Sequence, residues 1–400
     1  MRSIPGAVTA PRGFRAAAVR CGIKTEGPDL TLIVSDGPAA LAALFTTNQV
    51  KAAPVLVSQE HTRSGCARAI VASSGNANCC TGERGLSDAR RMAELAAEGL
   101  GLVPEQVLVA STGVIGHALP MGLLEAGIPR AVAALSPESG EEAARGIMTT
   151  DTRPKSLAVE VEIGGRPVRI GGIAKGVGMI EPNMATLLSF ITTDAPCDPR
   201  TLREVLVRVC DQTFHCLTVD SDTSTNDTLL LLANGASGGP PLQSNPSHLR
   251  RFEDALRHVA LYLVKEIARD GEGATRLIQV QVDGCAGTAS ARQVAKSIAN
   301  SPLVKTAIFG QDPNWGRLMM AAGKAGVPFS QAEVQVWIGD QQVVVDGAVA
   351  PDYSEVVTHA QLTGPEVSLR LRLGPGPGQA TVYTCDFSYD YVKINAEYHT

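Results

Sequence analysis

The chain has 400 residues and is mildly acidic, with 35 lysines and arginines, 40 aspartates and glutamates and a formal net charge of -5. Its length exceeds that of a usual single domain and predicts two domains or one large layered domain. The sequence has no lysine or arginine run that would follow a phosphate backbone, so we expect no nucleic-acid partner.

No apolar stretch approaches the roughly 20 residues that span a bilayer, and the first residues lack the apolar core of a secretory signal. We therefore expect a soluble, cytoplasmic protein with no membrane partner. The nine cysteines are scattered apart from adjacent Cys79 and Cys80, without a Cys-x-x-Cys pair or histidines at zinc-ligand spacing. Reduced thiols and no metal site are expected.

Helical and strand patterns alternate along the chain, which favours an α/β fold. A helix capped by Ser87 is expected over residues 88–96, and a longer helix capped by Ser247 repeats apolar residues at helical spacing. Turns at 163–166 and 338–341 predict hairpins, so part of the sheet is antiparallel and a doubly wound dinucleotide fold is disfavoured. The predicted strands are residues 107–110, 157–163, 187–193, 229–232, 277–282, 334–338 and 367–373, with loop-like spacers at 234–241 and 374–378.

The most informative segment runs from Lys175 to Leu188 and places Thr186 between a bent, glycine-rich stretch and a buried strand. Four further blocks stand out in the same chain. They are Ser74-Gly75-Asn76-Ala77-Asn78, Ser111-Thr112-Gly113-Val114-Ile115-Gly116, Thr149-Thr150-Asp151-Thr152-Arg153-Pro154-Lys155 and Asp312-Pro313-Asn314-Trp315-Gly316-Arg317.

With these blocks in this order, the whole chain resembles the ornithine acetyltransferase family, also known for N-acetylglutamate synthesis. The resemblance implies an α/β fold, a layered αββα sandwich of mixed, partly antiparallel sheets. It also implies self-cleavage between Ala185 and Thr186, which gives fragments 1–185 and 186–400. The two fragments are expected to stay associated, with two copies of each in the assembly.

Thr186 is the predicted nucleophile. A threonine hydroxyl is a weak nucleophile unless a base takes its proton, and a freed α-amino group with a pKa of about 8 can serve as that base. In the uncut precursor the same hydroxyl would attack the carbonyl of Ala185 and give an ester that water opens. In isolation, a threonine before a strand would be unremarkable.

The block at residues 111–116 follows an apolar strand and contains glycines, so its backbone can turn with amides exposed to an oxyanion. The resemblance identifies Thr112 and Gly113 as the oxyanion-hole residues. A plain glycine-rich strand exit is the alternative interpretation of this block alone.

The substrate-binding residues implied by the resemblance are Thr149, Lys175, Thr186, Glu272, Asn395 and Thr400. Glu272 also has a physical rationale, because a carboxylate between two glycines can approach a ligand ammonium group closely. The aromatic and apolar run at residues 386–395 predicts a docked C-terminal tail.

Two other segments admit alternative interpretations. Residues 220–227 are rich in oxygen ligands but lack the central glycine and distal glutamate of a calcium loop, so a hydrogen-bonded turn is predicted. Residues 171–176 lack the Gly-Lys-Ser/Thr ending of a phosphate loop.

Cys79-Cys80 stands where the family more often has alanine and cysteine, a departure expected to affect packing.

The implied reaction transfers acetyl from N-acetylornithine to glutamate through an acetyl-threonine, with ping-pong kinetics, in arginine biosynthesis. No cofactor is needed, although acetyl-CoA is a second acetyl donor in some members. Two alternatives remain: a self-processed N-terminal-threonine aminopeptidase or amidohydrolase that uses water as acceptor, and an uncleaved amino-acid-binding protein. Free acetate as the product would favour the first, and an intact chain the second.

Overall fold

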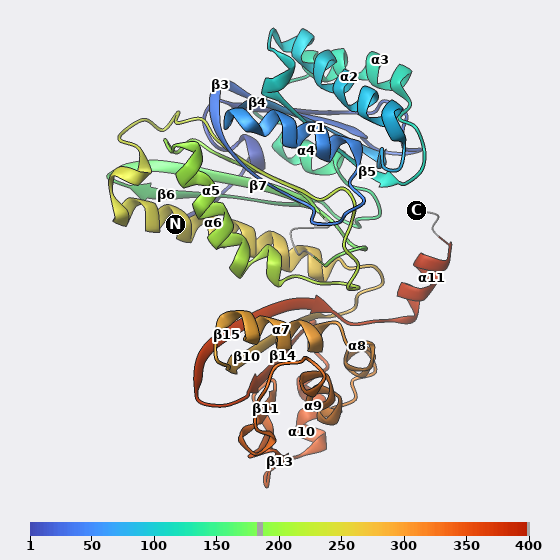
Figure 1. Cartoon of the computed structure of the whole chain (residues 1–400), viewed down its shortest axis with the longest axis vertical. Helices are drawn as coiled ribbons and strands as arrows, with labels where there is room; N and C mark the ends of the chain where they lie inside the picture. The colour runs from blue at the N-terminus through green and yellow to red at the C-terminus, as the bar shows by residue number, and fades with distance from the viewer. Residues whose placement is uncertain (182–186, 398–400) are drawn as a thin grey trace.

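The computed structural model of the chain describes residues 1–181 and 187–397. Ala185, Thr186 and Thr400 therefore lie outside the described residues. The described chain forms two lobes, each with its own sheet, and its last helix returns toward the first lobe (Figure 1).

The first lobe is built on a nine-stranded sheet in the order β1-β6-β7-β8-β9-β3-β4-β5, with β2 paired to β3. Neighbours are mostly antiparallel, but β8–β9 and β4–β5 are parallel. The strands are β1 (Arg2–Ile4), β2 (Phe14–Val19), β3 (Leu30–Phe45), β4 (Cys66–Asn76), β5 (Val107–Val114), β6 (Lys155–Ile163), β7 (Arg166–Lys175), β8 (Leu188–Thr193) and β9 (Thr228–Ala233).

The long strand β3 belongs to both halves of this sheet. Its first half pairs with β2 and β4, its second half pairs with β9, and the register shifts between Val34 and Ala39. Apolar side chains from the two halves meet in one core, where Ile70 of β4 and Phe190 of β8 are both fully buried. The two halves therefore face each other as two layers.

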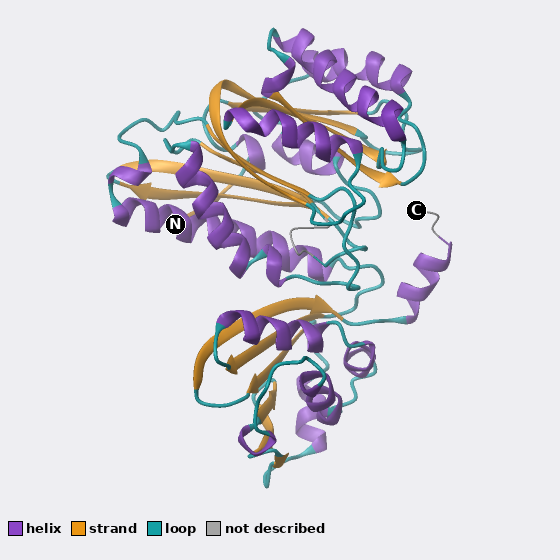
Figure 2. Ribbon diagram, viewed as in Figure 1, coloured by secondary structure: helices purple, strands orange, loops and turns teal. Residues whose placement is uncertain are grey.

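Helices cover the outer faces of both layers (Figure 2). The outer face of β3–β5 packs against α1, α2 and α3, and the outer face of β6–β9 packs against α5 and α6. Mixed α/β structure with layered sheets, as predicted, is confirmed. The helices of this lobe are α1 (Ala53–His61), α2 (Gly82–Leu100), α3 (Met121–Ala133), α4 (Gly140–Gly146), α5 (Pro199–Gln212) and α6 (Pro246–Arg269).

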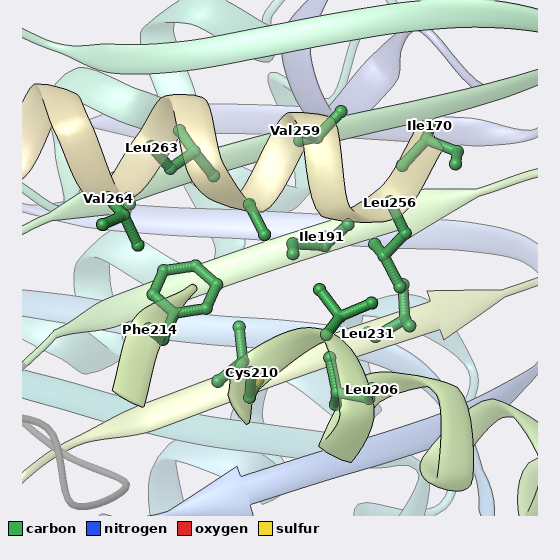
Figure 3. Packing of buried hydrophobic residues seen from close by; sticks show 14 of the residues in the cluster. Ile170, Ile191, Leu206, Cys210, Phe214, Leu231, Leu256, Val259, Leu263 and Val264 are labelled. Carbon is green, nitrogen blue, oxygen red and sulfur yellow. The ribbon is translucent and has the colours of Figure 1, made fainter. Parts of the chain in front are cut away.

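The spacing of apolar residues explains why the sequence of α6 forms a helix on the sheet. Leu256, Val259 and Leu263 recur on one face and are fully buried against the sheet (Figure 3). Each fully buried leucine contributes on the order of 2 kcal/mol. The Asn245 side chain caps the helix by accepting from the Ser247 amide at 2.9 Å, so the prediction of Ser247 as the cap is wrong.

The second predicted cap is also wrong, because α2 begins at Gly82 and Ser87 lies inside it. The hairpin predictions are correct: β6 and β7 pair at Ile163 and Arg166. The next hairpin joins β11 and β12 through Ile338 and Gln341.

The second lobe has a six-stranded sheet in the order β13-β12-β11-β14-β10-β15 and a core separate from that of the first lobe. The sequence predicted its strands at residues 277–282, 334–338 and 367–373 but not that they form a lobe of their own. Its elements are β10 (Leu277–Gly284), β11 (Gln335–Ile338), β12 (Gln341–Val345), β13 (Ala348–Val349), β14 (Glu366–Arg372), β15 (Gly376–Cys385), α7 (Thr288–Ala299), α8 (Pro302–Phe309), α9 (Trp315–Gly323) and α10 (Glu355–Gln361), followed by α11 (Tyr389–Glu397).

The predicted cleavage position falls between β7 and β8, which are antiparallel neighbours with Lys175 opposite Leu188. Strand β8 also pairs with β9 on its other side. Fragments 1–185 and 186–400 would therefore share one sheet.

No helix within residues 1–181 and 187–397 is long and apolar enough to cross a membrane.

Candidate active site

A cavity of about 280 Å³ lies where the ends of β5 and β7 meet the loop after α6 and the helix α11. Six of the predicted site residues line it: Thr112, Gly113, Thr149, Lys175, Glu272 and Asn395. Other lining residues include Thr150, Val177, Gly178, Asp220, Asn226 and Tyr391. Residues far apart in the sequence are thus brought to one place.

The cavity reaches toward the start of β8. A smaller adjoining pocket of about 20 Å³ shares Thr112 and Lys175 with the main cavity and is also lined by Leu187 and Leu188. Leu187 is the residue directly after Thr186. The chain directly after residues 182–186 thus lies beside Thr112 and Lys175.

The turn at residues 220–227 holds this part of the chain. The Asp220 carboxylate accepts from the amides of Met179 and Ile180 at 2.6 and 2.8 Å, and the amide of Asp222 donates to it at 3.2 Å. Burial raises the pKa of Asp220, against these hydrogen bonds. The predicted hydrogen-bonded turn is confirmed.

Asn226, at the end of this turn, was missed by the sequence analysis. Its Nδ2 donates to the carbonyl oxygens of Ala77 and Ser111 at 2.6 and 2.8 Å. The side chain therefore fixes the ends of β4 and β5 next to the cavity. An asparagine in an oxygen-rich turn gave no signal of this distant contact.

The predicted oxyanion residues lie at the end of β5, where Gly113 pairs with Gly75 of β4. Gly113 has φ 133°, and a Cβ there would lie 2.3 Å from the carbonyl carbon of Gly75. Only glycine fits this backbone and this close approach. The blocks at residues 74–78 and 111–116 thus form one structural unit.

Cys79 and Cys80 follow directly after that unit. Their sulfur atoms lie 3.8 Å apart, and both thiols are free. Cys79 packs in a small apolar cluster with Ala52, Val55 and Ala77, and burial raises its pKa. It acts in the structure as a small apolar side chain.

Lys175 joins the oxyanion element to the substrate side of the cavity. Its Nζ donates to Oγ1 of Thr112 at 3.2 Å. Burial lowers the pKa of Lys175, while the nearby carboxylates of Asp151 and Glu272 act to raise it. A partly desolvated cation therefore faces the cavity.

Glu272 is one of the acidic residues that line the cavity, together with Asp220 and Asp222. Its carboxylate accepts from Thr150 Oγ1 at 3.2 Å and from Asn395 Nδ2 at 2.9 Å. A Cβ on Gly178 would lie 2.4 Å from Oε2 of Glu272, so the absent side chain of Gly178 makes room for the carboxylate. The sequence analysis noted the glycines on each side of Glu272 but not Gly178.

The C-terminal tail that carries Asn395 is tied to the loop of Glu272. Asp386 accepts from the amides of Thr275 and Arg276 at 2.8 and 2.9 Å, and Ser388 Oγ donates to the Gly273 carbonyl at 2.5 Å. Beyond these contacts, Asn395 is exposed apart from its bond to Glu272. The tail is therefore held at residues 386–388 and through Asn395, but α11 has no buried residue, so the predicted docking through aromatic and apolar side chains is found only in part.

A buried ion-pair network behind the cavity was also missed. Lys155 Nζ donates to carboxylate oxygens of Asp151 and Asp270, both at 2.6 Å. Burial opposes ionisation of Asp151, but the charges of Lys155 and Lys175 lower its pKa to about 2. Asp151 and Lys155 are four residues apart in one sequence block, and this spacing could have indicated their ion pair.

Within the described part of the chain, no three His, Cys, Asp or Glu side chains come together as metal ligands. The cavity instead offers a hydroxyl, a glycine backbone, a cation and a carboxylate. Such groups are suited to bind a zwitterionic amino-acid derivative and to stabilise an oxyanion.

Comparison with known proteins agrees with the family resemblance. The ArgJ family model matches residues 15–400. The arginine biosynthesis bifunctional protein ArgJ of Symbiobacterium thermophilum is 51% identical over 403 residues, covering 100% of both chains. That of Geobacter sulfurreducens is 49% identical over 390 residues, covering 97% of this chain and 99% of the relative.

A solved structure supports the same assignment. The crystal structure of the arginine biosynthesis bifunctional protein ArgJ from Bacillus halodurans matches with 40% identity and a TM-score of 0.50. The match covers 52% of this chain and 98% of the solved chain. This chain belongs to the ArgJ family.

Proposed function

We propose that this protein is an arginine-biosynthesis enzyme that transfers acetyl from N2-acetylornithine to glutamate through an ester on Thr186. The observation that carries this proposal is the single cavity lined by Thr112, Gly113, Lys175 and Glu272 beside the start of β8. The names of the curated relatives, arginine biosynthesis bifunctional proteins, support the pathway.

The charges of the cavity suit the donor. N-acetylornithine carries a carboxylate, an acetamide and a side-chain ammonium group. Lys175 would pair with the carboxylate and Glu272 with the ammonium group, because each charge meets its opposite in a partly desolvated site. Thr149 and Asn395 would add polar contacts, together with Thr400.

The proposed first step forms the acyl-enzyme. Oγ of Thr186 attacks the acetyl carbon, and the α-amino group of Thr186 takes the hydroxyl proton. The oxyanion would be stabilised by Thr112 and Gly113. Since Lys175 donates to the Thr112 oxygen, the hydroxyl proton of Thr112 remains available to donate to that oxyanion.

The first half-reaction ends with the release of ornithine. Collapse of the tetrahedral intermediate breaks the C–N bond, and the proton held by the Thr186 amine passes to the departing α-amine of ornithine. In the second half-reaction the neutral α-amine of glutamate attacks the ester carbonyl, and its proton passes through the Thr186 amine to the departing threonine oxygen. The C–O bond breaks, N-acetylglutamate is released and the Thr186 hydroxyl is regenerated. The ester stores the acyl group, so no cofactor is required, and acetyl-CoA would be an alternative acetyl donor.

We include self-cleavage between Ala185 and Thr186 in the proposal, because the base is the amine that cleavage frees. In the Bacillus halodurans structure nearly the whole solved chain matches only 52% of this chain, so the solved chain is about half as long. Cleavage before Thr186 would divide this chain near its middle. The shared sheet of β7 and β8 would hold the fragments together, two of each in the cytoplasmic assembly.

The test is to supply N-acetylornithine labelled in its acetyl group, with and without glutamate, and to identify the labelled product. Label in N-acetylglutamate supports the proposal. Label in free acetate alone would replace it with the amidohydrolase alternative, and binding without turnover by an uncut chain would favour the binding protein.

A matched pair of variants examines the donor site. Glu272→Gln removes the proposed ammonium partner and should raise KM for N-acetylornithine about tenfold or more, since a hydrogen bond to a charged group contributes roughly 1.5–3 kcal/mol. Glu105→Gln changes an exposed glutamate outside the cavity and should leave KM unchanged. Equal KM values for both variants would remove Glu272 from the donor site.

A further inference from the structure

Three buried charged side chains lie behind the cavity: Asp151, Lys155 and Asp270, called here the buried trio. The side chains of Asp151 and Lys155 are 0% exposed and that of Asp270 is 4% exposed. Among the described residues that line the cavity, none belongs to the buried trio. These charges therefore act through other residues.

One carboxylate of the trio fixes the wall that carries Lys175. Asp151 accepts from the amide of Gly176, the residue after Lys175, at 2.8 Å. It also accepts from the amide of Thr149 at 3.1 Å. Thus Asp151 holds two substrate-binding candidates by their backbone.

The other carboxylate holds the part of the wall that leads to Glu272. Asp270 ends α6 two residues before Glu272, and its carboxylate accepts from the amide of Thr152 at 3.1 Å and from the Thr152 hydroxyl. Lys155 lies between the two carboxylates and bonds to both. The Lys155 ammonium group thereby links the two carboxylates behind both walls, in addition to the bond from the Glu272 amide to the Val177 carbonyl at 2.9 Å.

We infer that Lys155 is a positioning residue, which sets the separation of Lys175 from Glu272 and so the fit of the donor's two charged ends. This inference rests on the proposed function for the identity of the donor. Lys155 does not touch the donor in this account. Without its charge, two buried carboxylates would repel each other and the walls would move apart.

The first experiment is a double-mutant cycle with Lys155→Met and Glu272→Gln, measured as KM for N-acetylornithine. Lys155→Met keeps most of the unbranched side chain but removes its charge, and should raise KM by about tenfold to 100-fold, because displacements of about 1 Å have effects of that size. In the Glu272→Gln background the same change should add little, since the group it positions is already lost. Equal, independent effects in both backgrounds would overturn the inference.

Two controls separate positioning from general damage. Lys265→Met alters a half-buried lysine outside the trio, on α6 and over the Tyr383 ring, and should leave KM unchanged. Asp270→Asn can keep the bonds to Thr152 while it removes one charge, and it replaces Lys155→Met if that variant does not fold. A stable Lys155→Met or Asp270→Asn variant with wild-type KM contradicts the inference.

The pH dependence of KM distinguishes loss of positioning from simple destabilisation of the fold. In Lys155→Met, a lower pH would protonate one of the two carboxyl groups of Asp151 and Asp270, and the two groups could then share that proton. The KM of this variant should therefore fall toward the wild-type KM as pH is lowered. Lys24 and Lys175 face Asp151, and Asp227 and Glu272 face Lys175, but these groups are the same in both enzymes. An unchanged ratio of KM values from pH 8 to about 6 would contradict shared protonation.

Hydrogen exchange tests the network without reference to the reaction. The amides of Thr149, Thr152 and Gly176 should exchange faster in Lys155→Met than in wild type, because their acceptors belong to the trio. Unchanged protection would overturn the network even if acetyl transfer is established. Conversely, faster exchange in a protein without acetyl transfer would refute the proposed function but not the network.

Discussion

The ammonium group of Lys175 lies 3.2 Å from the hydroxyl oxygen of Thr112 and donates a hydrogen bond to it. Lys175 ends β7 and Thr112 lies in the last part of β5, so this bond joins the two facing layers of the first lobe. It also orients the hydroxyl. The oxyanion and substrate elements of the proposed mechanism are thereby one unit.

Removal of the Thr112 hydroxyl should therefore impair chemistry more than binding. Thr112→Val is expected to lower kcat about 100-fold or more, because loss of one oxyanion donor costs roughly 3 kcal/mol. Thr112→Ser keeps the hydroxyl and should retain most of the activity. Steady-state kinetics on cleaved protein give the comparison, and a valine variant with wild-type kcat would exclude the hydroxyl from the oxyanion site.

The pH dependence of transfer should have two limbs. Activity should rise as the Thr186 amine, with an ordinary pKa of about 8, loses its proton. It should fall again as pH rises through the pKa of Lys175, which burial lowers below the usual value for lysine. In Lys175→Arg the group stays charged and the alkaline limb should disappear; persistence of that limb would assign it to another residue.

A methyl group at residue 178 should disturb the donor site. The Cβ of Gly178→Ala would lie 2.4 Å from Oε2 of Glu272 and would displace the carboxylate from its bond with Asn395. We expect a rise in KM for N-acetylornithine of about tenfold, comparable to loss of a charged hydrogen bond. Gly323→Ala has open space around its Cβ and is the matched control; similar KM for both would show that the carboxylate adapts freely.

Stability in acid should depend on Asp151. Its pKa is lowered from the usual 3.8 to about 2, so its stabilising contribution is fully present above about pH 4 and is lost as pH falls toward 2. A shift of this size corresponds to about 2 kcal/mol. Denaturant unfolding at pH 6 and pH 2.5 should show a larger loss in wild type than in Asp151→Asn, and identical losses would contradict the ion-pair account.

The sequence predicted the layered α/β class because strand runs such as residues 229–232 and hairpin turns such as 163–166 are local signals. Six of the residues that line the cavity were also predicted, through the family resemblance. Their meeting depends on topology: β4 and β5 pair in parallel, and the turn before β9 reaches across to both through Asn226. No single block contains that information.

Contacts between distant residues were not predictable from local patterns. Asp270 bonds to Lys155 although 115 positions separate them, and nothing near either residue marks the partner. The helix caps failed for a different reason. Asn245 precedes a proline at the first helical position and caps α6, whereas Ser247 was chosen from its closeness to the apolar repeat.

The most direct test of the account is the intact mass of the purified wild-type chain and of Thr186→Ala, each paired with the acetyl-transfer assay. We predict that the wild type gives two fragments, the second beginning at Thr186, and transfers acetyl. Thr186→Ala should remain a single 41.8 kDa chain without transfer. A wild-type chain that transfers acetyl while uncut, or a Thr186→Ala chain still cut after Ala185, would contradict the assignment of Thr186 as nucleophile.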